Sequence, residues 1–247
     1  FMTMAYVMVV HPSILSSAIF LNTPRDLFSE LVVVTGISAV LGTFIMGLLA
    51  KYPFVLAPGM GTNAYFAYSV VLGLGISWRT ALAAVFVQGI IFLLLTVSDI
   101  RRHLITAVPN SIKSATTAGI GMFLAYLGLA SSVKTGGAGL IVANEVTKTA
   151  FGSFREPATL LALFGIVITC FFMLRRIKGA LLWGIGGTAI LGWILGVAAP
   201  PKGFIAIPQW PSHLFGQALV GLSEVNLNNL IDFAAIILVF LFVDMFD

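Results

Sequence analysis

Long runs of uncharged residues constrain the fold of this chain more than any other feature of its sequence. Eight runs of at least 18 residues contain no Asp, Glu, Lys or Arg, and seven of them are apolar enough to be candidate membrane spans. Each is close to the roughly 20 residues that a helix needs to cross the hydrocarbon core of a bilayer. Only 9% of the residues are charged, whereas a soluble domain carries about 25%, so a soluble enzyme and a nucleic-acid-binding protein are excluded. The seven candidate spans are residues 1–24, 31–50, 52–78, 80–98, 114–133, 157–174 and 179–201.

An eighth apolar stretch begins at Asp232. The charge-free run 203–223 contains two prolines and several polar side chains, and this composition predicts a loop. The sequence begins and ends inside apolar stretches, and we expect it to be a fragment cut within membrane spans at both ends. The expected fold is therefore an all-α polytopic membrane protein with seven spans and the start of an eighth.

The distribution of Lys and Arg among the loops predicts the orientation in the membrane. If the spans alternate in direction, seven Lys and Arg fall on one side, at residue 51 and within residues 99–113 and 175–178. The opposite side has six, in much longer loops. Because short cytoplasmic loops are enriched in Lys and Arg, we expect a cytoplasmic N-terminus in a cell (inner or plasma) membrane. Residues 99–112 are expected to lie along the cytoplasmic interface.

The third run contains a sequence that disfavours a continuous helix. Pro58 removes a helical hydrogen bond at a cost of about 3 kcal/mol, and it is followed by Gly59, Gly61 and Thr62. We expect the backbone to run extended there and to resume as a helix near Asn63. Irregular backbone at membrane depth survives only against protein or a water-filled cavity, and transporters use such broken helices to bind substrates. A Pro-kinked helix whose glycines allow close packing is the alternative.

Two carboxyl groups lie near the end of the eighth stretch. Asp244 and Asp247 are three residues apart, which puts them on one helix face. Asp244 is 12 residues beyond Asp232, or roughly 18 Å along a helix, so we expect it inside the hydrocarbon core. Acids at this depth mark ion or proton pathways, because burial favours the protonated form. The alternative is that both acids reach the far interface.

Three further side chains in the spans are candidates for contact with a ligand. His11, which precedes Pro12, is a lone imidazole in the first span. It is either a proton shuttle or ligand donor, or a packed and hydrogen-bonded histidine. Tyr65 and Phe66 follow the predicted break, where their rings are available for stacking. The single cysteine, Cys170, excludes an internal disulfide and a cysteine-rich metal site.

Several segments together resemble one family of transporters. They are similar to the azaguanine-like guanine/hypoxanthine/adenine permeases, a branch of the nucleobase–cation symporter 2 (xanthine/uracil permease) family. In that branch an Asn is usual where His11 stands. The segments are Phe1–Leu15, Ala57–Phe66 (APGMGTNAYF), Val71–Trp78, Ala83–Ile90, Val108–Lys113, Ala118–Phe123 and Phe240–Asp247 (FLFVDMFD).

The resemblance implies a uracil-permease-like fold of fourteen spans in two inverted seven-span repeats. In that family the third and tenth spans are broken, each with a short strand, and purine binds between them against the eighth. The implied core domain comprises residues 1–98 and 232–247, and the gate domain comprises residues 113–201. Residues 202–231 are then an extracytoplasmic loop.

The resemblance also implies a binding site. Asn63 falls on the polar position of the third span, Asp244 on the purine-binding acid of the eighth, and Asp247 on a second acid needed for transport. The glutamate expected in the tenth span lies beyond Asp247, in the second repeat. We therefore expect proton coupling through Asp244 and Asp247. The expected substrate contacts are Gly61, Thr62, Asn63, Ala64, Phe66 and Asp244.

The function expected from these features is proton-coupled symport of guanine, hypoxanthine or adenine by movement of core against gate, without a cofactor or metal. The expected partners are the purine, the bilayer and the second repeat of the same chain, and not nucleic acid. The preferred purine, the choice of H⁺ or Na⁺ and homodimerisation stay open. One alternative is a sulfate/bicarbonate-type anion carrier of the same fold, although Asp244 would repel an anion. The other is an intramembrane aspartate enzyme, for which spans 1–7 offer neither a second acid motif nor a metal-binding His cluster.

Overall fold

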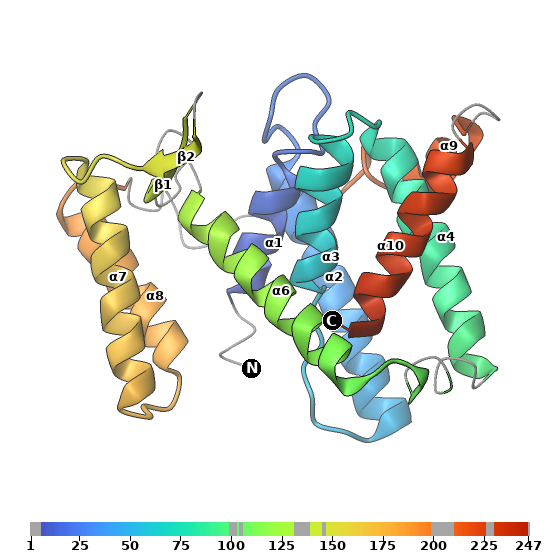
Figure 1. The fold of residues 1–247 in the computed structure, drawn as a ribbon, viewed down its shortest axis with the longest axis horizontal. Coiled ribbons are helices and arrows are strands. Elements are labelled where there is room, and N and C mark those ends of the chain that lie inside the picture. The colour runs from blue at the N-terminus through green and yellow to red at the C-terminus, as the bar shows by residue number, and fades with distance from the viewer. Residues whose placement is uncertain are drawn as a thin grey trace. The chain divides into compact units, whose positions relative to one another are not determined.

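The structure, a computed structural model, describes residues 6–98, 103, 106–130, 139–144, 147–198, 210–225 and 230–246 (Figure 1). These residues are mostly helical. Their packing divides the chain into two units. The first unit consists of Val7–Ile120 with Pro208–Asp247, and the second of Phe1–Tyr6 with Gly121–Ile207.

The elements of the first unit come from both ends of the chain. Two of its helices, α2 and α3, continue directly into wider, π-helical turns, η1 and η2. Helix α6 (Asn110–Ala130) begins in this unit and ends in the second. The other elements are α1 (Val7–Leu15), α2 (Phe28–Ile45), η1 (Met46–Ala50), α3 (Met60–Ala64), η2 (Tyr65–Val71), α4 (Trp78–Val97), α9 (Gln217–Ser223) and α10 (Leu230–Phe246).

Four helices within the described residues are long and apolar enough to cross a membrane. They are Phe28–Ala50, Trp78–Val97, Asn110–Ala130 and Pro157–Leu174, and they coincide with four of the predicted runs. The prediction of a multi-pass membrane protein agrees with this finding. The first predicted span, residues 1–24, is not helical throughout its described part, because α1 ends at Leu15. Turns follow α1, and in them the Ser17 hydroxyl donates to the Ile14 carbonyl at 2.6 Å.

The third predicted span is interrupted as expected. Described residues 51–59 form neither helix nor strand, so the short strand implied by the resemblance is absent from this segment. The helix resumes at Met60, three residues before the expected position, after Gly59 in an extended conformation (φ −65°, ψ 135°). Thr43 on α2 holds the irregular backbone, since its Oγ1 accepts from the Leu56 N–H at 3.0 Å and donates to the Leu56 carbonyl at 3.3 Å. One side chain thus satisfies both peptide groups of Leu56.

Helices α4 and α10 lie side by side in the core of the first unit (Figure 1). The buried face of α10 carries Phe233, Ile236 and Phe240, which recur at helical spacing. The facing stripe of α4 includes Ala81 and Ala84, both fully buried. Small side chains on α4 leave room for the large side chains of α10, which brings the two backbones close together.

The segment before α10 is tied to α2 and α4. Residues 202–231 were expected to be a loop, but part of this stretch forms α9. A Cβ at Gly221 of α9 would overlap the carbonyl of Arg79 at the start of α4, so only glycine allows this approach. Arg79 also pairs with Glu224 at 3.7 Å. This tertiary contact explains why a short helix forms where the composition predicted a loop.

The second unit contains a β-hairpin that corrects the all-α expectation. Strands β1 (Ile141–Asn144) and β2 (Lys148–Phe151) pair antiparallel, with Ile141 opposite Phe151 and Asn144 opposite Lys148. The Asn144 Oδ1 accepts from the Thr147 N–H at 3.1 Å and so stabilises the turn. The β-branched residues Ile141 and Val142 in β1 and Thr149 in β2 favour this pairing.

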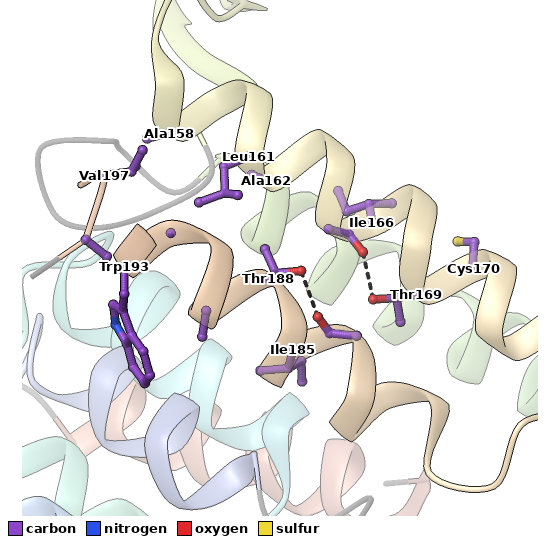
Figure 2. A pocket seen from close by; sticks show the side chains of 15 residues that line it. Ala158, Leu161, Ala162, Ile166, Thr169, Cys170, Ile185, Thr188, Trp193 and Val197 are labelled. Carbon is purple, nitrogen blue, oxygen red and sulfur yellow. Dashed lines mark hydrogen bonds between the residues drawn. The ribbon is translucent and has the colours of Figure 1, made fainter. Parts of the chain in front are cut away.

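Helices α7 (Pro157–Leu174) and α8 (Ala180–Ile194) pack through a reciprocal arrangement of glycine and threonine. Gly165 faces Thr188, and Gly184 faces Thr169, so that a Cβ on either glycine would clash with the opposing threonine. Each threonine hydroxyl donates at 2.7 Å to the glycine carbonyl four residues earlier in its own helix, as Figure 2 shows. This is the small-residue contact typical of membrane helices.

Candidate functional site

The carboxyl group of Asp244 connects the broken third span to α4. The Thr62 hydroxyl donates to Asp244 Oδ1 at 3.1 Å, and the Gln88 amide donates through Nε2 to Asp244 Oδ2 at 2.8 Å. These three residues come from α3, α4 and α10. The structure therefore places the Asp244 carboxyl of α10 against the helix that follows the break.

The inward direction of Asp244 follows from the pattern of α10. Asp244 lies four residues after Phe240 and eleven after Phe233, on the same face as these buried side chains. Its own side chain is half-buried. The carboxyl consequently faces α3 and α4, and both oxygens accept hydrogen bonds from neutral donors.

Asn63, the neighbour of Thr62, has a buried acceptor without a partner among the described residues. Its side chain is 5% exposed, and its Nδ2 donates to the His11 carbonyl at 3.4 Å. Its Oδ1 is buried and receives no hydrogen bond from the described part of the chain. Leaving such an atom unsatisfied costs about 1–3 kcal/mol. Asn63 Oδ1 is therefore available to a ligand that offers an N–H group.

His11 is a hydrogen-bonded link between α1 and α2. Its Nδ1 lies 3.0 Å from Thr35 Oγ1, and the Thr35 hydroxyl donates its proton to the Leu31 carbonyl at 2.7 Å. Because a hydroxyl has a single proton, the His11 Nδ1 must carry the hydrogen of the first contact. This geometry matches the packed, hydrogen-bonded histidine that the sequence left as one of two interpretations.

The other predicted site residues lie in or beside the helix after the break. Gly61 and Ala64 are buried, and Phe66 is 3% exposed within the hydrophobic cluster of the first unit. The Tyr65 ring meets Phe240 edge-on, with centroids 5.3 Å apart. Both aromatic rings thus pack against protein in this structure. Asp247 lies outside the described residues.

Gln88 is a polar contact of Asp244 that the sequence analysis did not single out. It is 2% exposed and lies on the α4 stripe with Ala81 and Ala84. A signal was present, because Gln88 is the single amide side chain in the charge-free run 80–98. An isolated amide in an apolar membrane helix needs a partner, although the sequence does not reveal which one.

A groove with a volume of about 650 Å³ lies elsewhere, along α7 and α8 in the second unit (Figure 2). Its walls are mostly apolar, and Thr169 and Thr188 use their hydroxyl protons on their own helices. Among the described residues, no group of three or more His, Cys, Asp and Glu side chains is placed to hold a metal ion. The polar side chains beside the interrupted third span lie in the first unit, at Asp244 and Asn63.

Comparison with known proteins gives the relationships of the chain. The family described as "Permease family" matches residues 1–245. Protein MJ0326 of Methanocaldococcus jannaschii is 45% identical over 247 residues, which is the whole chain and 53% of the relative. The guanine/hypoxanthine permease PbuO of Bacillus subtilis is 36% identical, over the whole chain and 54% of the relative. The adenine permease AdeP of Escherichia coli is 35% identical, over the whole chain and 52% of the relative.

The chain thus spans about half the length of these relatives. The resemblance inferred from the sequence motifs is confirmed, and the relatives are permeases, not enzymes. Together with the apolar helices, the matches identify a multi-pass membrane protein. The chain belongs to the Permease family, in the branch that includes these guanine/hypoxanthine and adenine permeases.

Proposed function

We propose that this chain forms the first seven-span repeat and the beginning of the eighth span of a fourteen-span transporter for purine nucleobases. The similarity to the guanine/hypoxanthine permease PbuO and the adenine permease AdeP supports this substrate class. The second repeat of the same protein would complete the site.

The contact between Thr62 and Asp244 carries the proposal. It joins residues 182 positions apart and sets a carboxyl group beside the interrupted span. Irregular backbone next to a polar side chain at membrane depth is the usual construction of a substrate site in secondary transporters. Asn63, one residue along from Thr62, adds the unoccupied Oδ1 acceptor.

The acceptors at this site suit the N–H groups on the edge of a purine. Each carboxylate oxygen of Asp244 receives one hydrogen bond from the described residues, and a carboxylate oxygen has room for a second. Asn63 Oδ1 offers a further acceptor. A neutral, planar base with several N–H groups would donate hydrogen bonds to these atoms. An inorganic anion would instead be repelled by the Asp244 carboxylate and the Asn63 amide oxygen.

Proton coupling is proposed for the same carboxyl group. The donors that reach Asp244 from the described residues are a hydroxyl and an amide, so its charge is not neutralised by a cation there. A carboxyl in this setting can bind a proton from one side of the membrane and release it to the other. Asp247 is proposed as a second acid of the pathway. No cofactor or metal takes part in this mechanism.

Alternating access is proposed to arise from movement between two domains. The core domain would comprise the spans at 1–98 and 232–247, and the gate domain those at 113–201. The division of the chain's packing into two units supports two separately moving bodies. The basic residues of the short loops support a cytoplasmic N-terminus in the plasma or inner membrane.

Asp244→Asn tests the proposal in the full-length protein, expressed in cells that lack their own purine uptake. Uptake of radiolabelled guanine, hypoxanthine and adenine should be abolished while the amount of protein in the membrane stays normal. Asp232→Asn is the matched control, because Asp232 lies on the same helix but is exposed. Normal uptake by Asp244→Asn would refute the assignment. Inhibition of radiolabelled hypoxanthine uptake by sulfate but not by unlabelled guanine would favour an anion carrier.

A further inference from the structure

Gln88 is an amide side chain that is buried in the apolar helix α4. Its side chain is 2% exposed, in a helix whose other buried residues are alanines. Burying an amide without hydrogen bonds is unfavourable. The Gln88 amide meets this requirement by donating to Asp244 Oδ2 at 2.8 Å.

The carboxyl group of Asp244 is held from two directions. Thr62, on the helix after the break, binds Oδ1, and Gln88, on α4, binds Oδ2. Two donors from different helices determine the plane of the carboxyl group, whereas one donor would leave it free to rotate. The remaining acceptor positions of both oxygens therefore have a defined direction.

We propose that Gln88 is a positioning residue for proton-coupled transport, which holds the Asp244 carboxyl in one orientation in both of its protonation states. This inference rests on the proposed function, because it assumes that Asp244 binds the substrate and the coupling proton. Gln88 does not itself contact the substrate in this scheme.

An amide is suited to both states of a carboxyl group. The ionised carboxyl only accepts hydrogen bonds, and the Gln88 NH₂ group supplies a donor. The protonated carboxyl donates from its O–H, and the Gln88 carbonyl supplies an acceptor after the amide turns about its last torsion. The proton arrives from the solution that faces the site, forms the O–H bond on Asp244 and leaves to the opposite solution. A leucine at this position would bind neither form.

Charged groups on the elements that pack against α10 are remote from Gln88. On α4, Arg79 is nine residues away, about 14 Å along the helix, and is paired with Glu224. On α10 itself, Asp232 is twelve residues before Asp244, about 18 Å. The helix after the break carries no charged residue, and its Tyr65 meets the Phe240 ring. Within the described residues, the neutral groups of Gln88 and Thr62 thus form the direct environment of the carboxyl.

The test uses Gln88→Leu and Gln88→Glu in the full-length protein. Initial rates of radiolabelled hypoxanthine uptake are measured over a range of external pH and divided by the amount of transporter in the membrane. Gln88→Leu should lower the maximal rate roughly tenfold or more at every pH, as expected for loss of a hydrogen bond to a charged group. Gln88→Glu should be as impaired at neutral pH and should recover in acid, where the introduced carboxyl is protonated and can donate to Asp244. Phe86→Leu, on the exposed face of α4, should behave as the wild type.

The outcomes separate this inference from the proposed function. Absence of nucleobase uptake by the unmodified protein would refute the function itself. Normal rates for Gln88→Leu, or equal rates for the Leu and Glu variants at every pH, would refute the role of Gln88 alone. If Gln88→Leu fails to reach the membrane, Gln88→Glu still tests the inference. Recovery of its uptake in acid would support the positioning role, and absence of recovery would refute it, because a purely structural role gives no such recovery.

Discussion

Thr62 donates its hydroxyl hydrogen to Asp244 across 182 residues of sequence, at 3.1 Å. The contact links the first turn after the break to the far end of α10. A hydroxyl beside a carboxyl supplies a donor to the ionised form and an acceptor to the protonated form. Thr62 therefore complements Gln88 on the opposite oxygen of the same carboxyl group.

Removal of the Thr62 hydroxyl should impair transport without disturbing the fold. Thr62→Val keeps the shape of the side chain and should lower nucleobase uptake roughly tenfold, since it removes one hydrogen bond to a charged group. Thr62→Ser retains the hydroxyl and should keep most of the activity. Initial uptake rates divided by the amount of protein in the membrane are the measurement. Similar losses in both variants would show that the methyl group matters and the hydroxyl does not.

Two glycines of α8 should respond in opposite ways to the same change. Gly184→Ala would drive a methyl group into Thr169 and should destabilise the α7–α8 pair by about 1–3 kcal/mol. Gly186→Ala meets open space and is exposed, so it should be neutral or stabilising by up to about 1 kcal/mol through helix propensity. Thermal unfolding of the purified protein in detergent compares the two. Equal melting temperatures would contradict the observed packing.

Glu30 should hold the segment before α10 in place. Its Oε1 lies 2.6 Å from His213 Nδ1, and its Oε2 accepts from the His213 N–H at 3.2 Å. Glu30→Gln weakens these charge-assisted contacts and should raise amide hydrogen exchange in residues 210–225. Glu156→Gln, at the start of α7 in the second unit, is the control and should leave that exchange unchanged. Unchanged exchange in Glu30→Gln would mean that Gly221 and Arg79 are sufficient to dock the segment.

The loop between α1 and α2 should loosen in acid. The backbone N–H of Asn22, followed by those of Leu21 and Thr23, lowers the pKa of Asp26 from its ordinary value of 3.8. Because the folded-state pKa is the lower one, Asp26 stabilises the loop fully above pH 3.8, and this contribution is lost as the pH falls through the folded-state value. Hydrogen exchange of residues 20–27 should rise over that range, and Asp26→Ala should show the higher exchange already at neutral pH. A pH-independent difference between the two proteins would exclude Asp26 as the cause.

The break in the third span was predictable because its causes are local. Pro58 and its neighbouring glycines disfavour a helix wherever they occur, and the structure is irregular up to Gly59. The depth of Asp244 in the membrane, expected from counting along an apolar helix, stays a prediction, and the buried stripe through Phe240 gives the direction of its side chain.

Other features depend on tertiary contacts that a single sequence does not display. Gln88 lies opposite Asp244 because α4 packs against α10, and no local pattern identifies that pairing. Helix α9 exists because Gly221 fits against the Arg79 carbonyl. Phe66 was expected to face a ligand, yet it packs in the hydrophobic cluster, since the side of the helix that an aromatic residue occupies depends on the neighbouring helices.

The paired hydrogen bonds between Thr43 and Leu56 restrict how a transport cycle could operate. Both peptide groups of Leu56 depend on one hydroxyl of α2, and in lipid no water would replace it. Separating the irregular segment from α2 would leave both peptide groups of Leu56 without a partner, so we expect this segment and α2 to move together. A solute would then enter through movement of other helices, and the contact between Thr43 and Leu56 would stay intact during the cycle.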